Sequence, residues 1–297
     1  MSRYAIWIIF CVGFFVALLA CRQEQPPPAF GFVEANNSYQ QYFGDPPEVR
    51  EGKAYARVAF LPLKEDTNRV SPVPIYLFKE SDQLTSILNR LASGELLLPI
   101  DSLLFNPFSS RINLAVNSRH DGTVTLLLEL PDDSSIDLEI FLPAIIETAV
   151  QFSDIERVIV LVDNEPVAGM PDGGYRSNPQ RVSDVAPPDL IMISGTWDEG
   201  EKDPEEIMVS FDRPVTINTF QLTHADGKRV DGEYFSSVFQ MAIVVHPENP
   251  SQFRDGMELT LAWDVIDAKG RVGTGNRSLP LQKFEHKVKL KSFQNSH

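Results

Sequence analysis

Histidine is the side chain that most often transfers protons near neutral pH, and this chain has five of them. They are His120, His224, His246, His286 and His297, and no two are four residues apart, as zinc ligands on one helix face would be. No Gly-x-Ser-x-Gly nucleophile motif and no glycine-rich phosphate-binding motif occurs. The sequence therefore predicts no catalytic residue and no enzymatic activity. A divergent hydrolase, with carboxylates brought together from distant segments, stays open as an alternative.

The densest group of carboxylates lies in residues 198–206, where six of nine residues are Asp or Glu. Carboxylate oxygens suit calcium, but the Asp-x-Asp-x-Asp-Gly spacing of a calcium loop is missing. We predict a solvated loop, with no metal site and no cofactor in the chain. A weak cation site in this loop is the alternative.

Tryptophan rings can stack on sugars, so they form a second class of possible ligand residue. Trp263 continues the apolar stripe of a predicted strand and is expected in the core. Trp197 lies beside the acidic loop and is the candidate ligand-binding residue. A peptidoglycan- or carbohydrate-binding protein is therefore an alternative function, with Trp197, Tyr175 and Tyr234 as the aromatic surface to inspect.

The N-terminus has the pattern of a secretory signal peptide. Arg3 is followed by a nearly unbroken apolar run from Ala5 to Leu19, which is short for a membrane-spanning helix. The run ends in Leu18-Leu19-Ala20-Cys21, which resembles the lipobox of bacterial lipoproteins. This resemblance implies that residues 1–20 are removed and that Cys21 carries two acyl chains such as palmitate, which suffice for stable anchoring. An uncleaved membrane helix is the alternative.

The lipobox resemblance implies an extracytoplasmic protein held at a membrane by lipid. In a diderm cell we expect the periplasmic side of the outer membrane, because Arg22 stands where an acidic residue is associated with inner-membrane retention. In a monoderm cell we expect the outer face of the cytoplasmic membrane. A formal net charge of −15 disfavours a nucleic-acid partner, since the surface repels phosphates.

The first half of the chain predicts a tether and an α+β domain. Residues 21–53 contain two proline runs and no clear hydrophobic period, as in an extended spacer, part of which could dock on the domain that follows. Residues 54–170 predict the order strand, strand, helix, strand, strand, helix, strand, with helical apolar spacing over 84–91. The valine-rich strand 157–162 is expected to be central and covered on both faces.

The second half predicts a linker and an all-β domain. Residues 171–188 are rich in Pro, Gly and polar side chains, which is typical of a linker. Residues 189–291 show repeated alternation of apolar and polar positions with Asp-Gly turns, which favours a β-sandwich. Residues 292–297 are expected to be a tail.

Two segments carry resemblances to known domain families. IETAVQFSDIERVIVLVDNEPVAG (146–169) resembles the GerM (GerMN) domain of sporulation and germination proteins, with Asn164 in place of the usual glycine. EEIMVSFDRPV (205–215) and RDGMELTLAWDVIDAKGRVG (254–273) are similar to bacterial Ig-like domains of the surface-layer (SbsA) type.

These resemblances imply a non-catalytic protein of the cell envelope. The GerM-like domain is then the interaction or assembly module, in homo- or hetero-assembly with an envelope protein. The Ig-like sandwich is a spacer or second contact surface. Unpaired edge strands of either domain offer a physical route to assembly.

Overall fold

Residues 31–108, 112–130 and 137–286 are described by the computed structural model of this chain. Cys21, the predicted signal peptide and the predicted tail lie outside these residues. The elements in chain order are β1 (Phe32–Ala35), α2 (Asn37–Phe43), β2 (Lys53–Pro62), β3 (Val70–Leu77), α3 (Gln83–Ala92), β4 (Asn113–His120), β5 (Thr123–Glu129), α4 (Leu138–Val150), β6 (Arg157–Val162), β7 (Glu165–Pro166), a 3₁₀ turn (Pro179–Arg181), β8 (Leu190–Asp198), β9 (Glu206–Phe211), β10 (Thr216–His224), β11 (Gly232–Ser236), β12 (Ala242–Pro247), a second 3₁₀ turn (Pro250–Gln252), β13 (Glu258–Ile266) and β14 (Val272–His286).

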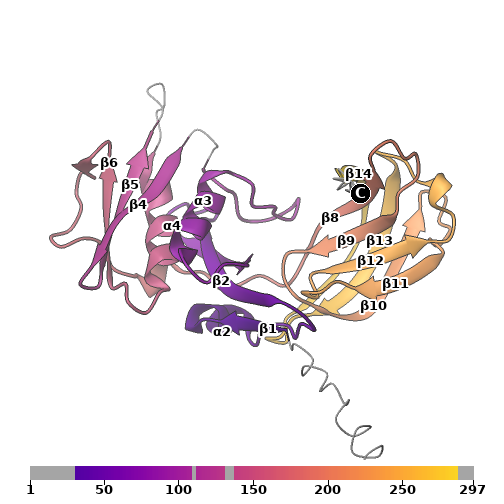
Figure 1. The fold of residues 1–297 in the computed structure, drawn as a ribbon, viewed down its shortest axis with the longest axis horizontal. Coiled ribbons are helices and arrows are strands. Elements are labelled where there is room, and N and C mark those ends of the chain that lie inside the picture. Colours follow the sequence, from indigo (N-terminus) through magenta and orange to yellow (C-terminus); the bar gives the residue numbers. More distant parts are fainter. Residues whose placement is uncertain (1–30, 109–111, 131–136, 287–297) are drawn as a thin grey trace, which may run out of the picture.

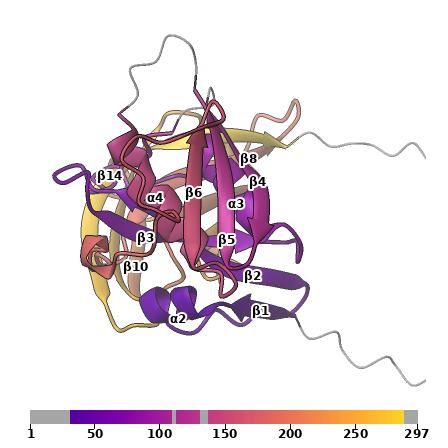
Figure 2. The same ribbon diagram turned by 90° about the vertical axis from the view of Figure 1, so that its left-hand side faces the viewer.

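The N-terminal part is an α/β unit in which α3 and α4 lie between two sheets (Figure 1). One sheet has the order β1-β2-β3 and the other has the order β4-β5-β6-β7. Every residue of α4 from Phe141 to Ala149 is buried, because the helix packs on a sheet at either side (Figure 2). The prediction of a mixed α and β domain is confirmed.

Residues 32–43, which the sequence analysis placed in the tether, form β1 and α2. β1 pairs in parallel with the start of β2. Asn36 caps α2 by accepting the Tyr39 N–H at 2.9 Å. Tyr39 and Phe43 are buried in the core of the α/β unit, so this stretch packs as part of the fold.

The helical spacing over 84–91 predicts α3 correctly, since its apolar residues are all buried. Pro143, which the sequence places within the second predicted helix, lies inside an uninterrupted α4. The expectation that strand 157–162 is covered on both faces is wrong. Val158 and Val160 are fully buried against the core, whereas Ile159 and Leu161 on the opposite face are half-buried.

The C-terminal part is β-rich, as predicted, and consists of one curled sheet of order β10-β13-β14-β8-β9-β12-β11. β14 joins its two halves, because residues 272–280 pair with β13 and residues 281–286 pair with β8. Inward side chains from both halves form one core that includes Phe211, Leu261 and Leu281. The two halves therefore face each other across a shared hydrophobic layer.

Candidate functional site

A cluster of charged side chains marks the boundary between the α/β unit and the β-rich unit. The Arg213 guanidinium is buried and donates to both carboxylate oxygens of Asp212, at 3.0 and 2.7 Å. It also donates to the Ala186 carbonyl at 2.8 Å. Arg271 donates from Nε to the Asp267 carboxylate at 2.7 Å. Each buried charge in the cluster has a partner of opposite charge. The pairing fixes the positions of Arg213 and Arg271, which contact the α/β unit.

The end of α2 rests on this cluster. Arg271 donates to the Tyr42 carbonyl at 2.8 Å, one of the carbonyls that end a helix without an intrahelical partner. The guanidinium carbons of Arg213 and Arg271 lie 5.6 and 5.9 Å from the centroid of the Phe43 ring. Burial raises the pKa of Asp212, although the adjacent Arg213 opposes that rise, and burial lowers the pKa of Arg271.

The turn between β11 and β12 makes a second contact between the units. The Phe239 ring packs against Tyr76 and Phe78, with centroids 4.9 and 5.8 Å apart. Met241 also packs on the core of the α/β unit. Aromatic and charged contacts thus join segments that are far apart in sequence and hold the units side by side (Figure 1).

The predicted linker 171–188 is itself fastened to the α/β unit. The buried Glu147 carboxylate on α4 accepts the Ser177 hydroxyl at 2.8 Å and the Asn178 N–H at 2.7 Å. The Ser183 N–H donates to the Val70 carbonyl of β3 at 2.8 Å. This segment therefore follows a fixed path up to Ser183.

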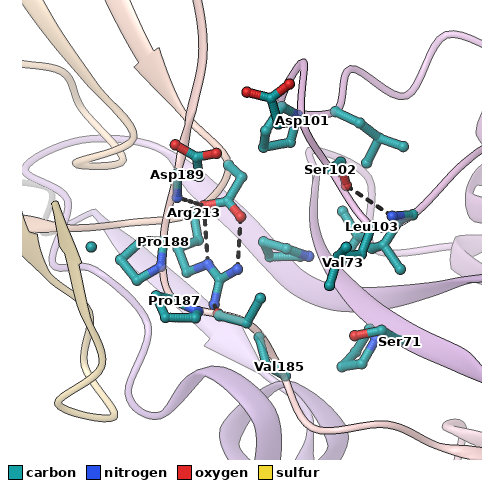
Figure 3. A pocket seen from close by; sticks show the side chains of 18 of the residues that line it. Ser71, Val73, Asp101, Ser102, Leu103, Val185, Pro187, Pro188, Asp189 and Arg213 are labelled. Atoms are coloured by element: carbon teal, nitrogen blue, oxygen red, sulfur yellow. Dashed lines mark hydrogen bonds and ion pairs between the residues drawn. The ribbon is translucent and has the colours of Figure 1, made fainter. Parts of the chain in front are cut away.

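A groove of about 440 Å³ opens beyond that point, between the two units (Figure 3). Most of its lining comes from the edge of β3, the loop after α3, the end of the linker and the start of β14, and the remainder comes from Leu63, Asp212 and Arg213. The lining includes Pro72, Pro74, Leu97, Asp101, Leu103, Asp184, Asp189, Val272 and Arg277.

Apolar side chains in this groove are exposed to an unusual degree. The exposed fractions are 60% for Leu97, 56% for Leu103 and 50% for Val272. Leu97 and Leu103 belong to the α/β unit, whereas Val272 belongs to the β-rich unit. Exposed apolar side chains that converge from two units are typical of a binding surface.

The charged groups at the rim are mainly acidic. Besides the paired Asp212 and Arg213, three carboxylates come from Asp101, Asp184 and Asp189, and one guanidinium comes from Arg277. Arg277 Nη2 lies 3.1 Å from Asp101 and 3.6 Å from Asp189. Arg277 Nη1 is buried without an acceptor among the described residues, and Asp184 has no ion-pair partner among them. The unpaired carboxylate of Asp184 can thus receive a cation at the rim.

Trp197, the candidate ligand-binding residue, lies in the core of the β-rich unit and is only 2% exposed. Its indole N–H donates to the Lys202 carbonyl at 3.1 Å. A ring this deeply buried has no free face for a sugar, so this placement argues against the sequence prediction. Trp263 is buried as well, which confirms its predicted place in the core.

The other two aromatic residues form no common platform with it. Tyr234 packs edge-on against Phe220, and its hydroxyl donates to the Val230 carbonyl. Tyr175 belongs to the α/β unit, where its backbone forms an isolated antiparallel β-bridge with that of Val158. The aromatic surface expected of a carbohydrate-binding protein is therefore not assembled from these three residues.

No group of three or more His, Cys, Asp or Glu side chains within residues 31–108, 112–130 and 137–286 is arranged to hold a metal ion. Across those same residues, no helix is long and apolar enough to cross a membrane. In the acidic loop, Glu206 lies 3.9 Å from His246 of the neighbouring strand. His120 is the last residue of β4, and its side chain is exposed beside Asp121 of the following turn.

The groove was not predicted from the sequence, although two local signals pointed to it. Pro72 and Pro74 interrupt an apolar strand, and proline inside a strand pattern marks an edge. The loop after α3 is rich in leucine where a loop is usually polar.

Residues 42–168 match the family model described as "Germane: Sporulation and spore germination". No curated protein sequence matches the chain. Among solved structures, the first GerMN domain of the sporulation protein GerM from Bacillus subtilis is 20% identical, with 41% of this chain and 93% of that chain covered and a TM-score of 0.32. The tandem GerMN domains of the same protein are 17% identical, with coverage of 60% and 58% and a TM-score of 0.33.

CopC from Methylosinus trichosporium OB3b is 12% identical, with 33% of this chain and 97% of that chain covered and a TM-score of 0.23. All three TM-scores are below 0.5, so these structures do not establish a shared fold. The family match lies on the α/β unit, which also supplies two walls of the groove. The similarity of this chain to the Germane (GerMN) family is therefore confined to residues 42–168.

Proposed function

We propose that this chain is a lipid-anchored protein of the cell envelope that acts as a non-catalytic protein-interaction module. The observation that carries the proposal is the groove between the units, where Leu97, Leu103 and Val272 are exposed together. A binding surface of this kind needs apolar area and hydrogen-bonding groups but no reacting side chain. Residues 42–168 match a family model that is described as belonging to sporulation and spore germination, and this match supports an assembly role.

The remaining parts of the proposal follow from the sequence. Residues 1–20 are a signal peptide, and Cys21 carries the lipid on the outer side of a membrane. The β-rich unit is an Ig-like sandwich that serves as a spacer and supplies one wall of the groove. The partner is an envelope protein.

Photo-crosslinking from within the groove tests the interaction. Leu103 is replaced by the photo-reactive residue benzoyl-phenylalanine in living cells, and illumination is expected to give a discrete protein adduct. A second substitution, Val272→Asp on the facing wall, is expected to abolish that adduct. The matched control carries the probe at Phe284, which is similarly exposed but lies on β14 outside the groove. An identical adduct pattern from Leu103 and Phe284, or none from Leu103, would contradict the proposed function.

The lipid anchor has its own test. Cys21→Ala is expected to block processing, so the chain keeps its signal peptide, migrates more slowly and incorporates no labelled palmitate. Cys11→Ala is the control, because that residue lies within the predicted signal peptide and its loss leaves the lipidated residue intact. Palmitate incorporation by the Cys21→Ala chain would overturn the anchor proposal and leave the groove proposal standing.

A further inference from the structure

The hydrogen bonds of β2 show in which direction the backbone N–H and C=O groups of the neighbouring β3 point. The Val58 N–H donates to the Gln151 Oε1 atom at 2.9 Å, and the Phe60 N–H donates to the Thr148 hydroxyl at 3.0 Å. Both acceptors are side chains of α4 or of the residue that ends it. Val58 and Phe60 therefore point their backbone polar groups away from β3.

Pro74 lies opposite Val58, and Pro72 lies opposite Phe60, in the antiparallel pair of β2 and β3. In such a pair, opposite residues point their backbone groups either both toward or both away from the partner strand. The carbonyls of both prolines consequently point outward, to the side on which the groove lies. The Val70 carbonyl, two residues before Pro72, confirms this direction because it accepts the Ser183 N–H of the linker.

The same prolines explain why the groove exists. The linker begins to pair in parallel with β3, through Val182 beside Val70 and the Ser183 N–H. The next bond of a parallel ladder would be donated by residue 72 to the Ser183 carbonyl. Pro72 has no N–H, so the ladder ends there and the linker leaves β3. At residues 72 and 74 the remaining edge therefore offers hydrogen-bond acceptors but no donors.

The chemistry of the groove selects a particular kind of occupant. Donors are needed for the two proline carbonyls. A cation suits the unpaired carboxylate of Asp184, beside Asp101 and Asp189, which share the one guanidinium of Arg277. Aliphatic side chains suit the exposed Leu103 and Val272. An extended chain places successive side chains on opposite sides, so alternating cationic and aliphatic residues can satisfy both walls.

We propose that the groove binds an extended segment of a partner protein in which Lys or Arg alternates with aliphatic residues. The inference rests on the proposed function and adds to it the chemistry of the partner. Because Pro72 and Pro74 have no N–H, the edge of β3 cannot form a full backbone ladder there, and side chains determine which segments bind.

Peptide binding to the full-length lipidated chain in zwitterionic lipid nanodiscs tests this inference. The probe is a blocked seven-residue peptide of alternating lysine and valine, and its partner peptide has glutamate in place of each lysine. We expect the lysine peptide to bind at least tenfold more tightly, with affinity falling as salt rises. Empty nanodiscs control for adsorption to lipid.

Substitutions of carboxylates at the rim test whether the peptide binds in the groove. Asp184→Asn and Asp101→Asn are each expected to weaken binding of the lysine peptide several-fold. Asp172→Asn, an exposed carboxylate outside the groove, is expected to leave it unchanged. Circular dichroism checks that each variant is folded.

Equal binding of the lysine and glutamate peptides, or equal effects of Asp184→Asn and Asp172→Asn, would overturn the inference. Self-association that Val272→Asp abolishes would also overturn it, because the occupant would then be a second copy of this chain. If photo-crosslinking from Leu103 still captures a protein, the proposed function survives that failure. If the lysine peptide binds but no adduct forms in cells, the proposed function fails and the peptide preference stands.

Discussion

The guanidinium of Arg213 lies over the ring of Phe43, 5.6 Å from its centroid, and thereby joins the β-rich unit to the end of α2. Arg213→Ala removes this contact and leaves the carboxylates of Asp212 and Asp267 buried with less compensation. Breaking a buried ion pair in this way costs about 3–5 kcal/mol of unfolding free energy. Urea unfolding of the full chain measures the loss. Arg254→Ala, at an exposed arginine, is the control and is expected to change stability by less than about 0.5 kcal/mol. Similar values for the two variants would contradict a role for this cluster in stability.

Beyond the residues of β2 that pair with β1, the N–H groups of Val58 and Phe60 donate to side chains of Gln151 and Thr148 rather than to another strand. Thr148→Val keeps the shape of the side chain but leaves the Phe60 N–H buried without an acceptor. The expected cost is about 1–3 kcal/mol, which is the desolvation penalty of an unpaired backbone group. Thr125→Val is the control, because that hydroxyl has no hydrogen-bond partner among the described residues. A loss no larger than that of the control would show that water replaces the threonine hydroxyl.

Alkaline pH is expected to destabilise the α/β unit through Tyr39. Its hydroxyl lies 2.6 Å from that of Tyr76, and burial raises the Tyr39 pKa to about 12 from 10.0. Burial also raises the Tyr76 pKa. The folded chain holds a proton that the unfolded chain has lost, so this stabilising contribution is present below pH 10 and disappears toward pH 12. Two pKa units correspond to about 2–3 kcal/mol.

Urea unfolding at pH 8 and at pH 11 checks this prediction. Tyr39→Phe is expected to lose less stability between those two pH values than the natural chain does. At pH 8 neither Tyr39 nor the phenylalanine that replaces it is charged. The difference in unfolding free energy at that pH therefore gives the cost of the substitution that does not depend on titration. An equal fall in both chains would mean that Tyr39 is not the titrating group.

Gly275 allows the Trp263 indole to lie against the neighbouring strand. The two residues are paired across β13 and β14, and a Cβ atom at residue 275 would overlap the indole ring. Gly275→Ala is expected to cost about 1–3 kcal/mol, as overpacking of a core does. Asn276→Ala, at the exposed neighbouring residue, is the control. Thermal unfolding compares the two variants, and a neutral Gly275→Ala would show that the indole moves aside freely.

Restoring a donor to the edge of β3 should close the groove. Pro72→Val supplies the N–H that can donate to the Ser183 carbonyl, so the linker can continue its parallel pairing. Hydrogen exchange at Val185 is then expected to slow, because that amide would bond to the carbonyl of residue 72. Asp66→Asn in an exposed turn serves as the control. Unchanged exchange at Val185 would show that the linker leaves β3 for another reason.

Several elements follow from the sequence because their cause is local. The apolar spacing of α3 and the strict alternation in β13 both set which side chains are buried, and Trp263 belongs to that alternation. Trp197 was misplaced, although a local signal was present. Gly195 lies two residues before it on the same face, and a Cβ there would overlap the indole. A glycine inside a strand indicates such a close approach.

The groove could not be derived in the same way. Its walls bring together Leu103, Asp184 and Val272, which are separated by 81 and 88 residues along the chain, so their proximity depends on long-range packing. The contact of Arg213 with Phe43 is equally non-local. Sequence periodicity reports which face of one element is buried, but it does not report which other element covers that face.

The two prolines of β3 also bear on how this protein resists aggregation. An uncovered strand edge that offers both donors and acceptors is a template on which strands of other molecules add without specificity. Here an incoming strand finds the Pro72 and Pro74 carbonyls but no matching N–H groups, so its own carbonyls would be desolvated without a partner. Molecules of this protein can consequently reach a high local concentration without adding to one another along this edge.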